Sequence, residues 1–256
     1  MTGPTPLLDF FKRGEVARDV RLLTARGELA PRAHEQLAIL ILLVADADPE
    51  IHEAADGTLN RIPEDALKAF LARSDAAEMR EFFADRGVLP AQIPAIDSEE
   101  PLIDTSPTTP PDRAAEPDRE SLTQRLAGMS FPQRLKAAVK GSREMRAALI
   151  RDPNKMIAAA VLSSPKLTDQ DVESFAKMAS VTEDVLRMIG ANRGWMKNYG
   201  VVAGLSRNPK TPIALSLNLL GRLNDRDVQM ISMDRNVPGA LRIAARKKIV
   251  DRASKK

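Results

Sequence analysis

The only tryptophan and the only tyrosine of the chain lie close together in the sequence. Trp195 and Tyr199 are four positions apart, a spacing that places two side chains on one face of a helix. Basic residues lie nearby: Arg193, Lys197, Arg207 and Lys210. An aromatic pair flanked by cations can stack a nucleobase or grip a peptide, so we take these six residues as a candidate partner-binding site. In the structural alternative, Trp195 packs between helical repeats and Tyr199 donates a hydrogen bond to a carbonyl.

Other residue types that carry chemistry do not form a recognisable pattern. Asp169, Asp171, Asp225 and Asp227 are spaced alike in two stretches of the chain, which indicates helix starts better than paired catalytic carboxylates. There is no cysteine, and the two histidines, His34 and His52, do not form a His-x-x-x-His pair. We therefore expect no catalytic residue, no metal site and no cofactor.

Charge is distributed unevenly along the chain. The overall net charge is +3, but residues 1–97 carry −6, residues 98–120 carry −5 and residues 121–256 carry +14. Residues 97–120 also contain five prolines and few apolar groups, which is typical of a disordered linker. The pattern predicts an acidic helical domain over 1–96, a disordered acidic linker over 97–120, and a basic repeat domain over 121–256.

Helical spacing of apolar residues recurs in both halves, and no segment alternates cleanly with a period of two. The first half predicts short helices, including one that starts at Pro49 and another at Pro63. The longest apolar run, Leu37–Ala45, is nine residues, whereas a membrane span needs about 20. The fold expected is all-α, and we expect no membrane partner and a cytoplasmic location.

The second half contains an internal repeat. A shift of 56 positions aligns residues 152–189 with 208–245 without a gap. Pro153 then meets Pro209, and Ile157-Ala158 meets Ile213-Ala214. The acidic motif Asp169-x-Asp171-Val172 meets Asp225-x-Asp227-Val228. We expect Asp152 and Asn208 to cap helices that start at the following proline. Each repeat then holds short helical hairpins that share a core with the next repeat.

This pattern resembles the HEAT-like and leucine-rich-repeat-variant families of α-solenoids. The residues that carry the resemblance are Asp152-Pro153…Ile157-Ala158…Asp169-x-Asp171-Val172 and their counterparts beginning at Asn208-Pro209. In the first half, Asp48-Pro49-Glu50-Ile51…Ala55…Leu59 is similar to the start of a HEAT-type second helix. The resemblance covers about residues 131–252 well and 32–86 loosely. It implies short helical hairpins stacked as an α-solenoid with a long concave binding face.

Three functions follow from this interpretation. The first is a non-catalytic scaffold that holds a protein partner, with an acidic partner favoured by the basic second half. The second is a nucleic-acid-binding module that uses the basic solenoid. The third is a HEAT-like DNA-repair enzyme, which the fold resemblance alone suggests. The opposite charges of the two halves also predict an intramolecular contact between them.

Overall fold

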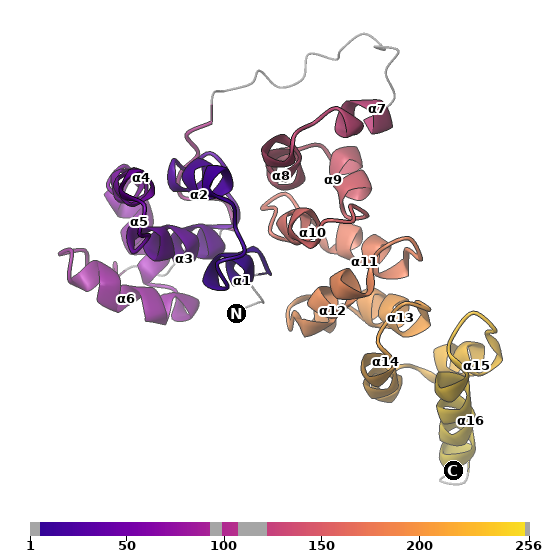
Figure 1. Ribbon diagram of the computed structural model, residues 1–256. Coiled ribbons are helices and arrows are strands. Elements are labelled where there is room, and N and C mark those ends of the chain that lie inside the picture. The colour runs from indigo at the N-terminus through magenta and orange to yellow at the C-terminus, as the bar shows by residue number, and fades with distance from the viewer. Residues whose placement is uncertain (1–5, 93–98, 107–121, 254–256) are drawn as a thin grey trace. The chain divides into compact units, whose positions relative to one another are not determined.

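The computed structural model describes residues 6–92, 99–106 and 122–253 (Figure 1). Within these residues the chain forms α-helices and three short 3-10 helices, and no strand occurs in them. The predicted all-α fold is therefore confirmed for the described residues. The chain divides into two compact units: unit 1 comprises Met1–Leu149 and Met156–Lys166, and unit 2 comprises Ile150–Lys155 and Leu167–Lys256. This division differs from the predicted domains, because residues that follow the linker in sequence belong to unit 1.

Unit 1 is built around one buried helix. The helices of its first part are α1 (Pro6–Lys12), α2 (Arg18–Ala25), α3 (Ala33–Val44), α4 (Pro49–Leu59), α5 (Glu64–Leu71) and α6 (Ala77–Ala84). Helix α3 packs against α1, α2 and α4 and buries Leu37, Ile39, Leu40 and Leu43 (Figure 1). Because its apolar residues face several neighbours, α3 has a continuous apolar run and not a single stripe.

The second part of unit 1 consists of residues that follow the linker. Its helices are α7 (Leu122–Ala127), α8 (Phe131–Lys140), α9 (Arg143–Leu149) and α10 (Lys155–Leu162). Helix α8 packs against α2, and the Nζ atom of Lys136 lies 3.0 Å from a carboxylate oxygen of Glu28. At the start of α3, the Arg32 amide donates to the Ser163 carbonyl at 3.2 Å. These contacts explain why the division of the chain does not follow the linker.

A buried carboxylate holds the first helix of unit 1 in place. Glu35 of α3 accepts hydrogen bonds from the amides of Leu7 and Leu8 at 2.7 and 3.0 Å, so it satisfies two amides at the start of α1. The Ser163 side chain also hydrogen-bonds to it. Burial raises the pKa of Glu35 above its ordinary value despite these bonds.

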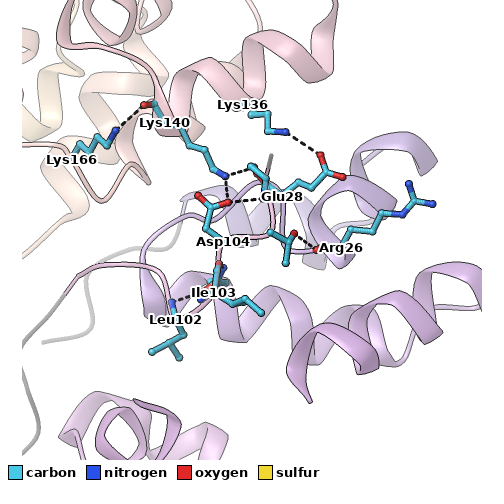
Figure 2. A network of polar contacts seen from close by, with 11 residues as sticks. Arg26, Glu28, Leu102, Ile103, Asp104, Lys136, Lys140 and Lys166 are labelled. Carbon is cyan, nitrogen blue, oxygen red and sulfur yellow. Dashed lines mark hydrogen bonds and ion pairs between the residues drawn. The ribbon is translucent and has the colours of Figure 1, made fainter. Parts of the chain in front are cut away.

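Part of the predicted linker is ordered. Residues 102–106 adopt no regular secondary structure, but they make hydrogen bonds to α3, to the loop after α2 and to α8 (Figure 2). Disorder was the wrong prediction for these residues, because polar contacts and not apolar burial hold them, and composition does not reveal such contacts. Residues 97–98 and 107–120 of the predicted linker lie outside the described residues.

Unit 2 repeats its helix boundaries with the period found in the sequence. It contains α11 (Asp169–Lys177), α12 (Glu183–Ala191), α13 (Tyr199–Arg207), α14 (Ile213–Leu219), α15 (Asp225–Met233) and α16 (Gly239–Ala253). A shift of 56 residues carries the bounds of α11 onto those of α15, and the first residue of α12 onto that of α16. Asp169 and Asp225 each begin a helix, as predicted. The stacking of the hairpins into a solenoid stays a prediction.

The predicted caps at Asp152 and Asn208 are wrong. Each side chain accepts a hydrogen bond from the amide two residues later, at 2.8 Å from Asn154 and 3.0 Å from Lys210, and so forms a turn. The following helices begin only at Lys155 and Ile213. Side-chain caps occur instead at the next helices, α11 and α15, where Thr168 and Asn224 accept from the third amide of the helix at 3.2 and 2.8 Å.

Candidate functional site

The segment around Trp195 and Tyr199 is not one helix. The Asn192 side chain accepts hydrogen bonds from the amides of Gly194 and Trp195 at 2.9 and 3.2 Å, and Trp195 then begins the 3-10 helix η2 (Trp195–Lys197). Asn198 caps α13 by accepting from the Gly200 amide at 2.8 Å, so Tyr199 is the first residue of a new helix. The predicted shared helix face is therefore wrong, because two Asn turns interrupt the helix.

The two aromatic residues also differ in exposure. Trp195 is 7% exposed and belongs to the core of unit 2, whereas Tyr199 is 43% exposed. The Trp195 ring therefore offers little area on which a nucleobase can stack. The structural alternative describes Trp195 better than the binding hypothesis does.

Tyr199 and Arg207 meet at one carboxylate. The Tyr199 hydroxyl donates to Asp227 Oδ2, and Arg207 Nη2 donates to Asp227 Oδ1. The Asn224 amide donates to the Tyr199 oxygen at 3.2 Å. Burial and the hydrogen bond to Asp227 raise the pKa of Tyr199 above its ordinary value. The phenol therefore stays protonated near neutral pH, and its hydrogen bond to Asp227 joins α13 to α15.

Three of the six predicted site residues carry exposed cations. Arg193 and Lys197 lie in the segment between α12 and α13, and Lys210 follows α13. Lys210 lines a shallow depression of about 580 Å³ together with Pro209, Pro212 and other residues of unit 2. Thus the structure brings Tyr199 and Arg207 together at Asp227, but it does not gather all six residues into one site.

A surface that the sequence did not reveal lies on α15 and α16. Among the residues that the structure describes, ten large apolar side chains are exposed, and eight of them belong to unit 2: Tyr199, Ile213, Leu217, Met230, Met233, Ile243, Ile249 and Val250. Met233, Ile243 and Val250 are 64%, 68% and 66% exposed. Arg246 and Lys247 are exposed between Ile243 and Val250 on α16. We call Met233, Ile243, Arg246, Lys247 and Val250 the α15–α16 surface.

Helices α15 and α16 pack against each other. Arg246 Nε donates to the carbonyl of Ser232 at 3.3 Å, which places α16 beside the end of α15 where Met233 lies. Ile243 precedes Arg246 by three positions, and Val250 follows Ile243 by seven, so Ile243 and Val250 share a helix face. The surface therefore combines apolar side chains with two cations.

The internal repeat contains a signal for this surface. A shift of 56 residues pairs Ile243 with Arg187, an exposed residue of α12 that forms an ion pair with Glu183 at 2.5 Å. The same shift pairs buried Leu186 with Arg242, which is partly exposed. Thus α16 carries an apolar side chain where α12 is charged, and a charged one where α12 is buried. Comparison of the two repeats residue by residue would have identified Ile243.

Within the described ranges, no three His, Cys, Asp or Glu side chains are grouped so that they could hold a metal ion. His34 Nε2 lies 3.1 Å from the Asp75 carbonyl oxygen, and His52 Nδ1 hydrogen-bonds to the Val44 carbonyl.

Among the described helices, none combines the length and the apolar character that a membrane crossing requires. Comparisons with protein-family models, curated proteins and solved structures found no match to this chain.

Proposed function

We propose that the protein is a non-catalytic binding scaffold that holds a protein partner on the α15–α16 surface. The observation that carries this proposal is the concentration of exposed apolar side chains in unit 2. Side chains of this size lose contact with water when they bind a partner, and their clustering marks interaction sites on protein surfaces. Arg246 and Lys247 add positive charge, which favours a partner with acidic residues around an apolar contact.

Nucleic-acid binding is the second candidate, and it is supported by the exposed cations Arg193, Lys197 and Lys210. Phosphate contacts need such cations, but they do not need exposed aliphatic side chains. Met233, Ile243 and Val250 therefore favour the protein partner. The base-excision alternative rests on the fold resemblance alone, and its test is the release of a base from damaged DNA.

The test compares the full chain with a Met233→Glu/Ile243→Glu variant. Both side chains are largely exposed, so we expect the variant to fold like the wild type. Leu89→Glu is the matched control, because Leu89 is 65% exposed and lies in unit 1. Each tagged protein is used to purify partners from nuclease-treated extracts of its native cells, and each candidate is then tested for direct binding with purified components.

We expect a partner protein that binds the wild type and Leu89→Glu directly and equally well. The same partner should bind Met233→Glu/Ile243→Glu at least about tenfold more weakly, which corresponds to a loss of about 1.4 kcal/mol of binding free energy. Equal direct binding to all three proteins would contradict the proposed surface. If the chain binds a short DNA duplex, and Arg193→Glu/Lys197→Glu/Lys210→Glu weakens that binding while Met233→Glu/Ile243→Glu does not, the nucleic-acid candidate replaces it.

A further inference from the structure

An extended segment of unit 1 is held in the way a protein holds a peptide ligand. Residues 102–106, which we call the strap, lie against α3, the loop after α2, and α8 (Figure 2). Leu102 and Ile103 are only half-buried, in contrast to the fully buried leucines of α3. Polar contacts, more than apolar burial, therefore hold the strap in place.

One buried side chain hydrogen-bonds to the strap backbone. Gln36 is 3% exposed, and its Oε1 atom accepts from the amides of Leu102 and Ile103 at 2.8 and 3.2 Å. Its Nε2 atom donates to the Ile103 carbonyl at 2.5 Å. A buried amide left without such partners destabilises the fold, so Gln36 favours an occupied site. These contacts involve backbone atoms, which any extended peptide could supply.

The loop after α2 offers its carbonyl oxygens to the end of the strap. The Thr105 amide donates to Gly27 at 3.2 Å, and the Thr105 hydroxyl donates to Arg26. The Ser106 hydroxyl donates to Glu28 at 2.9 Å. Gly27 adopts a φ of +78°, and a Cβ atom at Gly27 would lie 3.2 Å from the Thr105 methyl group. The glycine therefore permits the strap to lie close to the loop.

Basic side chains of unit 1 face the acidic residues in and before the strap. Lys140 Nζ lies 2.5 Å from Asp104 and 2.6 Å from the Ser106 hydroxyl (Figure 2). Burial opposes ionisation of Asp104, but the hydrogen bonds from Lys140 and Ser106 and the charge of Lys140 together hold the pKa of Asp104 below its ordinary value. Just before the strap, Glu99 lies 3.6 Å from Arg32 and 4.0 Å from Arg73. The surroundings of the strap are thus locally basic, although residues 1–97 carry a net charge of −6.

We infer that the residues that hold the strap form a binding site for extended acidic peptides and that the strap is its exchangeable resident. The peptide class has two apolar residues, then Asp, then two hydroxyl residues, as in Leu102-Ile103-Asp104-Thr105-Ser106. Gln36 binds the backbone of such a peptide, Lys140 selects its Asp, and the carbonyls of the loop after α2 accept from its hydroxyl groups. This site lies in unit 1 and is independent of the α15–α16 surface.

The tether sets how strongly the strap competes with a separate peptide. A segment linked by a short chain reaches an effective concentration on the order of 1 mM. A free peptide at micromolar concentration therefore binds the wild type poorly, even if its contacts are the same. A chain whose own strap is weakened should bind the same peptide at least about tenfold more tightly.

The test measures fluorescence anisotropy of a labelled peptide with the sequence of residues 99–106. It is added to the full-length wild type and to Ile103→Pro/Asp104→Lys, which removes one amide and places two lysines together. The expected result is at least about tenfold tighter binding by the variant. Adding Gln36→Leu to that variant should weaken peptide binding about tenfold or more, because three hydrogen bonds are lost.

A charge exchange tests whether the peptide occupies this site. In Lys140→Glu the native strap is repelled, and a peptide with Lys at the position of Asp104 should bind more tightly than the original peptide. The Lys140→Glu variant can also test the proposal if Ile103→Pro/Asp104→Lys does not fold. The proposal is overturned if neither variant binds its matching peptide, or if binding does not depend on Gln36 or on the charge at position 140. Loss of folding in both variants would overturn it too, because the strap would then be an integral part of the core.

Discussion

Replacement of Trp195 by alanine tests whether its ring is part of the core of unit 2. The backbone amide that donates to Asn192 is retained in the variant, so the turn before η2 can still form. The change therefore removes mainly the buried ring.

The expected loss follows from burial. An aromatic side chain of this kind buries about 150–250 Å², which at about 25 cal/mol per Å² gives an upper bound of roughly 4–6 kcal/mol. Trp195 is 7% exposed, so nearly all of this area is removed from water. Truncation of large aromatic residues in cores costs about 3–5 kcal/mol, and we expect a loss in this range. For a unit of this size the midpoint of thermal unfolding should fall by about 20 °C.

The assay is thermal and urea unfolding of the full chain, followed by circular dichroism. We expect the transition of unit 2 to move while that of unit 1 stays in place. Tyr199→Ala is the matched control, because this ring is 43% exposed and its loss should cost less. If Trp195→Ala unfolds like the wild type but binds the partner of the scaffold more weakly, our assignment of Trp195 to the core is wrong.

Three further predictions concern the contacts of both units. In urea unfolding, Asp227→Asn should lower the stability of unit 2 by about 2 kcal/mol, because it weakens both the ion pair with Arg207 and the hydrogen bond from Tyr199. Tyr199→Phe removes only the hydrogen bond and should lower the stability by about 1 kcal/mol. Equal losses would contradict the shared contact at Asp227. Burial raises the pKa of Glu35 in the folded chain, so the stability of unit 1 should fall as pH rises from the ordinary glutamate value through that raised pKa. Glu35→Gln should flatten this dependence in unfolding at a series of pH values, and an unchanged slope would show that Glu35 does not cause it. Gly27→Ala should destabilise unit 1 by about 1–2 kcal/mol, because its φ is +78°. It should also speed hydrogen exchange at the Thr105 amide, and unchanged exchange would argue against the strap contact.

Much of the helical order was predictable because its causes are local. Apolar spacing and helix-starting residues predicted helices at Pro49 and near Pro63, where the structure has α4 and α5. The 56-residue repeat predicted equal spacing of Asp169 and Asp225, and both residues begin helices. Local spacing also produced errors. An Asn side chain can end one helix and start the next, so the four-residue spacing of Trp195 and Tyr199 did not mean one helix.

The sequence alone determined the helical class, the period of the repeat and the charge of each segment, because each is a property of neighbouring residues or of composition. Only the tertiary structure decided that residues 102–106 are held by Gln36 and Lys140, which are distant in sequence. It also decided that Trp195 is buried and that Ile243 is exposed. Burial and long-range hydrogen bonds depend on which helices pack together, and that choice minimises the free energy of the whole fold, so no short stretch of sequence records it.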